Sequence, residues 1–279
     1  GKVAIKREDT GDVFAVMGKG YEPVQNVEAF QFFDDVVGEG QAIYNTAGTL
    51  HGGKVVWILA KLPYAMDKIP GDSIDAYVLL MNSHDGSTAL RMMNTNVRVV
   101  CQNTLNATGV NDLKRVGFYG KHTKNIKTKT EEARAMIDRI GVYNAWFEAQ
   151  VDRMINTQIT IDEVDLFLKE LFQFKKDEKV GDQRAYYAEK QDRRLVAAYD
   201  SVMDAMVHPT NLVGGMQGTQ WQAYNAVTWY LDHEKPVRGA ATGLEADSKR
   251  LESSWLYGGN DLRMKAQNIL MPSYAAFGG

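Results

Sequence analysis

The first third of the chain alternates apolar and polar residues in short runs that turn-forming residues separate. A period of two is typical of strands with one buried face, and connections of three or four residues containing glycine are typical of hairpins. Connections this short can join only antiparallel strands. The pattern predicts three hairpins, formed by residues 2–7 with 12–18, 41–50 with 54–62, and 74–82 with 87–94.

One helix interrupts these strands over residues 26–38. Phe30, Phe33 and Val37 have helical spacing, Asn26 is of a type that caps helices, and Gly38 is of a type that ends them. We expect this helix to cross one face of an antiparallel sheet.

Helical spacing replaces strand alternation after about residue 130. The spacing of a capping box occurs twice, at Thr128 with Glu131 and at Thr160 with Glu163. A further helix is expected from about Arg184 to Val207. It must end near His208, because Pro209 prevents its continuation. Thr219 can cap the helix that follows, and two short helices are expected over 248–256 and 261–270. One face of the long helix after residue 130 is predicted to comprise Ala133, Ile137, Ile140, Phe147, Val151 and Met154.

Strands that precede helices predict an α+β fold. Residues 1–129 would form an antiparallel sheet with a crossing helix and a basic connector. Residues 130–279 would form a helical region packed on that sheet, within one integrated domain. Trp221, Tyr224, Trp229 and Tyr230 concentrate in one helix, for which core packing is favoured over a platform for stacked bases.

Length and composition are those of an ordinary globular protein. The chain has 279 residues, 44% of them hydrophobic and 24% charged, and its single cysteine, Cys101, lies in an apolar run that favours a buried role. No window approaches 18 consecutive apolar residues, and the first residues have no apolar signal core. We therefore expect a protein without a membrane span that works in the cytoplasm.

Charge is distributed unevenly along this acidic chain. Residues 91–129 contain eight Lys or Arg and one acid, Asp112, which gives +7, so the remainder must sum to −10 for the formal net charge of −3. Such a concentration of cations predicts an anionic partner, and the interleaved Phe118, Tyr119 and His122 could stack on bases. The alternative is a solvated connector whose charges serve solubility.

Candidate catalytic groups are few. The five histidines never occur as a close pair, and no Cys/His cluster has the spacing of a zinc site. The stretch "GGMQGT" at 214–219 lacks the lysine of a phosphate-binding P-loop. We expect no metal and no cofactor, while an enzyme with a composite site stays open as an alternative.

Four separated segments together resemble a known family: residues 96–107 ("NVRVVCQNTLNA"), 120–134 ("GKHTKNIKTKTEEAR"), 221–233 ("WQAYNAVTWYLDH") and 246–270 ("ADSKRLESSWLYGGNDLRMKAQNIL"). The chain is similar over most of its length to the phage/plasmid-like protein family, a group of unknown function from bacteriophages, prophages and conjugative plasmids. The resemblance implies a mobile-element protein that acts inside a bacterial cell.

The hairpins, crossing helix and basic connector are also similar in outline to phage-type single-strand annealing recombinases. This similarity implies a homo-oligomer that holds single-stranded DNA by its backbone and needs no nucleophile or metal. The alternative is a phage structural or host-defence-inhibiting protein that acts through protein–protein contacts. The residues expected to bind nucleic acid are Arg91, Arg98, Lys114, Arg115, Tyr119, Lys121, His122, Lys124, Lys127 and Lys129.

Overall fold

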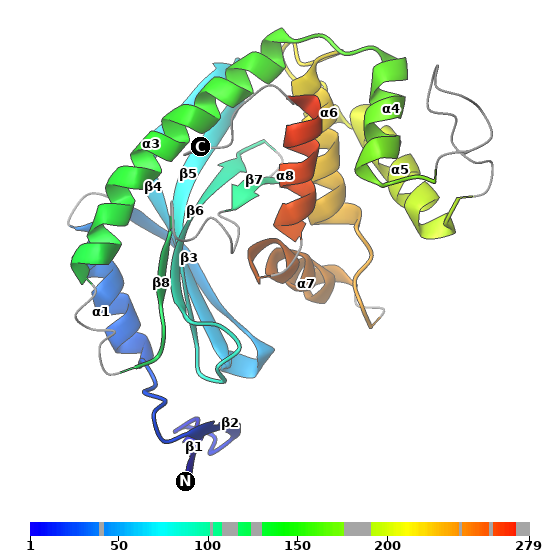
Figure 1. Ribbon diagram of the computed structural model, residues 1–279. Helices are drawn as coiled ribbons and strands as arrows, with labels where there is room; N and C mark the ends of the chain where they lie inside the picture. The colour runs from blue at the N-terminus through cyan, green and yellow to red at the C-terminus, as the bar shows by residue number, and fades with distance from the viewer. Residues whose placement is uncertain are drawn as a thin grey trace.

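The computed structural model confirms the α+β class, with strands first and helices later (Figure 1). It describes residues 1–38, 42–100, 103–107, 117–123, 130–175, 191–239, 242–256 and 259–271. Cys101 and Thr128 lie outside the described residues.

The main sheet is an antiparallel meander in the order β3-β4-β5-β6-β7, and β8 pairs with the other half of β6. Short turns join β3 to β4, β4 to β5 and β5 to β6, so the two hairpins predicted for this region are confirmed. The strands are β3 (Ile43–Leu50), β4 (Val55–Ile69), β5 (Asp72–Ser83), β6 (Leu90–Arg98), β7 (Asn103–Ala107) and β8 (Phe118–Gly120).

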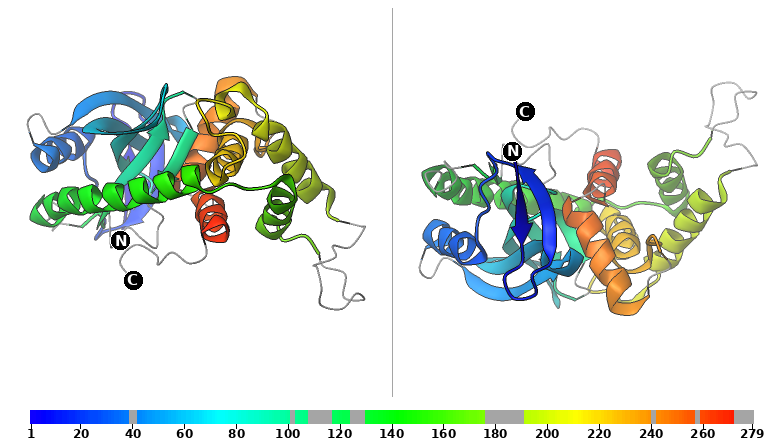
Figure 2. Two further views of the ribbon diagram at one scale, coloured as in Figure 1. Left: turned by 90° about the horizontal axis from the view of Figure 1, so that it is seen from above. Right: turned by 90° about the horizontal axis from the view of Figure 1, so that it is seen from below.

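Two helices, α1 (Asn26–Val37) and α3 (Thr130–Asn156), cover one face of this sheet (Figure 2). Phe33 and Ile140 are buried there against Val78 and Met92 of the strands. Burial of such apolar side chains stabilises each by roughly 1.5–3 kcal/mol. The predicted apolar face of α3 is thus confirmed by the burial of Ala133, Ile140, Phe147, Val151 and Met154, with Ile137 partly buried.

The start of α1 differs by one residue from the prediction. Gln25, and not Asn26, is the N-cap residue, and its backbone N–H donates to the Glu28 carboxylate at 3.1 Å. Asn26 contacts the His84 ring instead, with 2.8 Å between Oδ1 and Nε2. A tertiary contact to a distant turn therefore displaces the cap that local sequence favoured.

The helical region forms its own apolar core beside the far end of β4 and β5 and the second half of α3. The capping box of Thr160 with Glu163 is confirmed at the start of α4, and Thr219 caps α6 as expected. The helix before Pro209 begins at Arg193 and ends at Met206 in the described residues. The helices are α4 (Ile161–Leu171), α5 (Arg193–Met206), α6 (Gln220–Trp229), α7 (Gly243–Leu256) and α8 (Gly259–Leu270).

A π-helical turn, η4 (Tyr230–Glu234), follows α6 and anchors this region to the sheet. Its Asp232 carboxylate accepts a hydrogen bond from the backbone N–H of Thr104 on β7 at 2.8 Å, and it pairs with the buried guanidinium of Arg263 on α8. Arg263 Nε in turn donates to the Thr104 carbonyl at 2.6 Å. One ion pair thus joins strand, π-turn and helix.

The N-terminal hairpin, β1 (Lys2–Lys6) with β2 (Val13–Gly18), is a separate two-stranded unit that lies beside the turn between β5 and β6 (Figure 1). Phe14 stacks on His84 at 6.2 Å between ring centroids, and the Tyr21 hydroxyl donates to the Ser83 carbonyl at 3.1 Å. Two strands alone are marginally stable, so these contacts to the sheet help to hold the hairpin.

Candidate nucleic-acid interface

The structure describes half of the residues expected to bind nucleic acid. Arg91, Arg98, Tyr119, Lys121 and His122 have described positions. The other five lie outside the described residues, so they stay as predictions: Lys114, Arg115, Lys124, Lys127 and Lys129.

Arg98 is removed from the expected surface because it is fully buried, with 0% of its area exposed. Its Nε donates to the Asp72 carboxylate at 2.5 Å, and Nη1 donates to Asn211 of the helical region at 2.9 Å. Nη2 donates to the Thr210 carbonyl at 2.5 Å. The expectation that Arg98 neutralises a phosphate is therefore corrected: the protein supplies the anion itself, and the arginine joins the sheet to the helices.

His122 is also removed from the surface. It is buried, its Nε2 lies 2.8 Å from the Asn82 side-chain oxygen, and its ring packs on Tyr21 at 5.2 Å between centroids. Burial, with a smaller contribution from the nearby His84, lowers the pKa of the imidazole to about 4. A ring that is neutral and enclosed near pH 7 offers no charge to a phosphate, so the structural role replaces the expected one.

Arg91 and Tyr119 do meet, on the sheet face opposite α1 and α3. They are directly paired residues of β6 and β8, and the guanidinium lies 5.9 Å from the centre of the Tyr119 ring. Tyr119 is 41% exposed, and Lys121, two residues further on, is exposed as well. A partly exposed ring beside a guanidinium is an arrangement that can stack on a base and contact a phosphate.

Two donors of Arg91 lack a partner. Its Nε and Nη1 atoms are buried and make no hydrogen bond to the described residues. Burial lowers the pKa of this guanidinium, and only Tyr119 acts in the opposite direction. An unsatisfied buried donor costs about 1–3 kcal/mol, so an acceptor from outside the chain would be stabilised at this position.

These two residues belong to a row that crosses the sheet, which we call the cross-strand row: Trp57, Met81, Arg91 and Tyr119. Each is directly opposite the next in the registers of β4, β5, β6 and β8. Directly opposed residues share a face, and three strand spacings make the row about 14 Å long. It therefore places an indole, a guanidinium and a phenol along one line.

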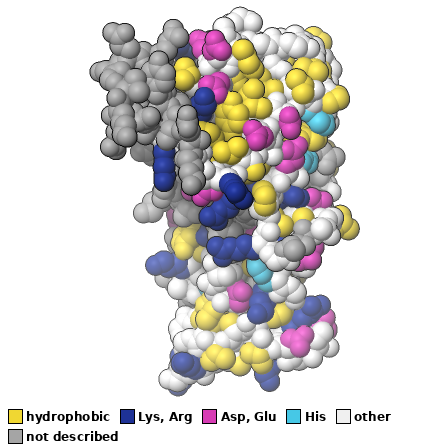
Figure 3. Space-filling model, turned by 90° about the vertical axis from the view of Figure 1, so that its right-hand side faces the viewer, with side chains coloured by type: hydrophobic (Ala, Val, Ile, Leu, Met, Phe, Trp, Pro, Cys, Tyr) yellow, Lys and Arg dark blue, Asp and Glu magenta, His cyan; other side chains and the backbone are white. Residues whose placement is uncertain are grey.

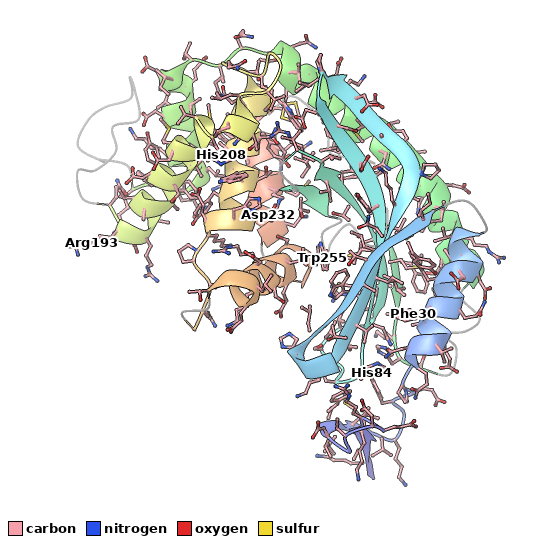
Figure 4. All side chains as sticks on the ribbon, turned by 180° about the vertical axis from the view of Figure 1, so that it is seen from behind. Phe30, His84, Arg193, His208, Asp232 and Trp255 are labelled. Carbon is pink, nitrogen blue, oxygen red and sulfur yellow. The ribbon has the colours of Figure 1, made fainter. Side chains whose placement is uncertain are left out.

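Trp57 forms the other end of this row, and packing contacts hold its ring in place. It lies across β3 at Gly48, where a Cβ would come within 2.7 Å of the indole ring. Trp255 of α7 packs edge-on against it at 5.0 Å between centroids, pointing toward the sheet (Figure 4). Helix α7 therefore closes the row at the β4 end, while Tyr119 leaves it open at the β8 end.

Sequence reasoning missed Trp57 because β4 is apolar on both faces near it, so the pattern "KVVWILAKL" does not show which face the indole occupies. The aromatic helix, by contrast, behaves as predicted. Trp221 and Tyr224 are fully buried, and the Tyr224 hydroxyl donates to the Leu105 carbonyl of β7 at 2.6 Å. Core packing is confirmed for these two rings.

The described ranges contain no helix long and apolar enough to cross a membrane, and no group of three metal-ligating side chains. Neither the curated proteins nor the solved structures include a significant match to this chain. The sequence model of one family does match, over residues 13–255, which is most of the chain. The chain therefore belongs to the family described as "Domain of unknown function (DUF932)".

Proposed function

We propose that this protein binds single-stranded DNA and promotes its annealing during recombination. In this proposal it is encoded by a phage or plasmid, as the family resemblance implies, and acts as a homo-oligomer in the cytoplasm of the bacterial host. Annealing needs a protein to hold and present bases, and it requires neither a nucleophile nor a metal.

The observation that carries the proposal is the Arg91–Tyr119 pair on the sheet face opposite α1 and α3, at the β8 end that α7 leaves open. Proteins that hold single strands combine cations along the backbone with aromatic rings on which bases stack. Arg91 supplies two buried donors without an acceptor among the described residues, and Tyr119 supplies a partly exposed ring. The cross-strand row continues from this pair through the buried Met81 to Trp57.

Charge distribution supports the same partner. The excess of +7 over residues 91–129 contrasts with −10 over the remaining chain. A polyanion would be attracted to that stretch and repelled elsewhere, which favours one orientation of binding. Arg98 is compensated by Asp72 from outside the stretch, so it is set apart from the cations that the proposal assigns to DNA.

Fluorescence anisotropy of labelled oligothymidylate, measured with the full chain at low and moderate salt, tests the proposal. We expect binding that weakens with salt, and a loss of about tenfold or more in a double variant with Arg91→Gln and Tyr119→Leu. The matched control is Arg193→Gln with Tyr44→Leu, which changes an exposed arginine and a half-exposed tyrosine elsewhere.

Absence of binding at low salt would end the proposal. Equal affinity of the double variant and the control would move the site away from the cross-strand row. A strand-annealing assay with complementary oligonucleotides then separates annealing from binding alone.

A second function is favoured by a different observation, the apolar surface of the N-terminal hairpin and the outer strand. Val3, Val13 and Val16 are exposed on the hairpin, and Ile43 and Tyr44 are exposed on the edge strand β3. Exposed edge strands with apolar side chains suit pairing with another chain. Light scattering that shows a concentration-dependent oligomer lost on Val16→Lys, with no DNA binding in either form, would favour an assembly or host-defence role.

A further inference from the structure

A cavity of about 690 Å³ lies between the segment after η4 and the face of α7. Its walls include residues 235–238, the α7 residues 249–250 and 252–254, and His51 from the turn between β3 and β4. The volume is within the range of pockets for small ligands, about 300–1,000 Å³. None of the described residues of the cationic stretch 91–129 lines it.

Among the described residues, four cations and one carboxylate line this cavity. The cations are Lys235, Arg238, Lys249 and Arg250, and the carboxylate is Glu252, which is 2.7 Å from the His51 ring. Lys and Arg side chains gather across the middle of the molecule on the side that carries α7 (Figure 3). The cavity therefore presents a positive wall.

Lys235 is a cation in this wall that the described protein does not neutralise. Burial lowers the pKa of its ammonium, and the positive charge of Arg263 acts in the same direction, with no carboxylate opposing them. None of the described carboxylates forms an ion pair with it. An ammonium that has lost water without gaining an anion is stabilised by any anion that enters.

Two of the other cations, Lys249 and Arg250, are held in position. Arg250 Nε donates to the Lys235 carbonyl at 3.0 Å, and Lys249 Nζ donates to the Arg238 carbonyl at 3.1 Å. Their carboxylate partners, Asp247 and Glu245, are well exposed, and exposed ion pairs contribute little. Helix α7 thus fixes the wall before a ligand arrives, which lowers the entropy cost of binding.

The cavity also has an apolar side, made by Leu231, Pro236 and Val237. Cationic and apolar side chains in one cavity fit a molecule that carries both a phosphate and a flat or apolar group. We propose that this cavity is a binding site for a phosphate-bearing ligand of about mononucleotide size. The proposal does not depend on the cross-strand row, since the ligand can be a free nucleotide or one nucleotide of a strand.

Isothermal titration calorimetry with the full chain tests it, using thymidine 5′-monophosphate, thymidine and oligothymidylate as probes. We expect the monophosphate to bind and thymidine to bind at least about tenfold more weakly, because the phosphate supplies the charge-assisted contacts. Lys235→Gln and Arg238→Gln should each weaken the monophosphate by about tenfold. Arg193→Gln, an exposed arginine at the start of α5, is the matched control and should leave it unchanged.

Binding of the monophosphate identifies a free nucleotide as a sufficient source. If only the oligonucleotide binds and Lys235→Gln weakens it, the phosphate comes from a strand, which also supports the site. The proposal is overturned if neither probe depends on Lys235. Circular dichroism melting of each variant excludes unfolding as the cause, and loss of DNA binding at Arg91 alone would leave this result untouched.

Discussion

Arginine is used in two opposite ways in this molecule. Two arginines lie at the seam, which is the contact between the sheet and the helical region, and one lies on the sheet face opposite α1 and α3. At the seam, Arg98 pairs with Asp72 and Arg263 pairs with Asp232, and both guanidinium groups are fully buried. On that sheet face, Arg91 has buried donors that no described residue accepts. The first two arginines hold the fold, and the third is the one that the proposed function assigns to a ligand.

The presence of a nearby carboxylate, more than the position of the cation itself, distinguishes an arginine that stabilises the fold from one that is available to a ligand. Arg91 and Arg98 lie on the same strand, seven residues apart, and sequence analysis assigned both to DNA. Asp72 reaches only Arg98.

The largest effect is expected from Arg98→Met. Removing one member of a buried ion pair leaves Asp72 uncompensated, which costs about 3–5 kcal/mol in the free energy of unfolding. Urea denaturation followed by circular dichroism measures it. The control, Arg193→Met at an exposed position, should change stability by less than about 0.5 kcal/mol.

A second variant keeps this prediction sharp. Adding Asp72→Leu to Arg98→Met removes the stranded carboxylate, so it should recover part of the lost stability. If the destabilising effects of the two substitutions simply add, so that the double variant is less stable than Arg98→Met, the two side chains do not act as a pair.

The next effect is acid sensitivity from His122. Its pKa is about 4 in the fold against about 6.5 in an unfolded chain, so between those values the unfolded chain binds a proton that the fold excludes. The contribution of the neutral His122 ring to the free energy of unfolding is therefore fully present above about pH 6.5. The free energy of unfolding falls by about 3 kcal/mol as the pH drops to 4. Denaturation curves across this range should show the fall, and His122→Gln should flatten it. An unchanged pH slope in the variant would contradict the buried, neutral ring.

Local features of this fold could be predicted from sequence, because a few neighbouring residues determine them. The capping box of Thr160 with Glu163 and the stop before Pro209 depend on contacts within one helical turn. The hairpins depend on turn residues between alternating runs. Where a distant group intervened, as His84 did with Asn26, the cap moved to Gln25.

The candidate sites could be predicted only in part, since they depend on partners far apart in the chain. Arg98 meets Asn211 of the helical region, more than a hundred residues later, and no local pattern records that contact. The cations of the α7 cavity are interspersed with acids such as Glu245 and Asp247, so a charge sum along the chain hides them. In the fold those two acids pair with Lys249 and Arg250 from their exposed side, and they do not line the cavity themselves.

A smaller effect on stability is expected where α7 packs on the sheet face opposite α1 and α3. The edge-on contact of Trp57 with Trp255 should contribute about 0.5–1.5 kcal/mol beyond burial. A double-mutant cycle of Trp57→Leu and Trp255→Leu, measured by denaturation, gives this coupling directly. A coupling near zero would mean that α7 is held by the hydrogen bonds of Ser254 with Asp232 and Arg263 and by His51–Glu252, without help from the row.

The smallest effect on stability is expected from Arg91→Gln, and it completes the contrast with Arg98. The variant loses a cation–π contact worth about 0.5–1 kcal/mol, and it relieves buried donors that each cost about 1–3 kcal/mol while unpaired. The two terms oppose each other, so the free energy of unfolding should stay within about 1 kcal/mol of wild type or rise. Affinity for oligothymidylate should fall in the same variant, with a shallower salt dependence. A large loss of stability would place Arg91 with Arg98 among the structural arginines, because a side chain that the fold needs must already have its partner within the fold.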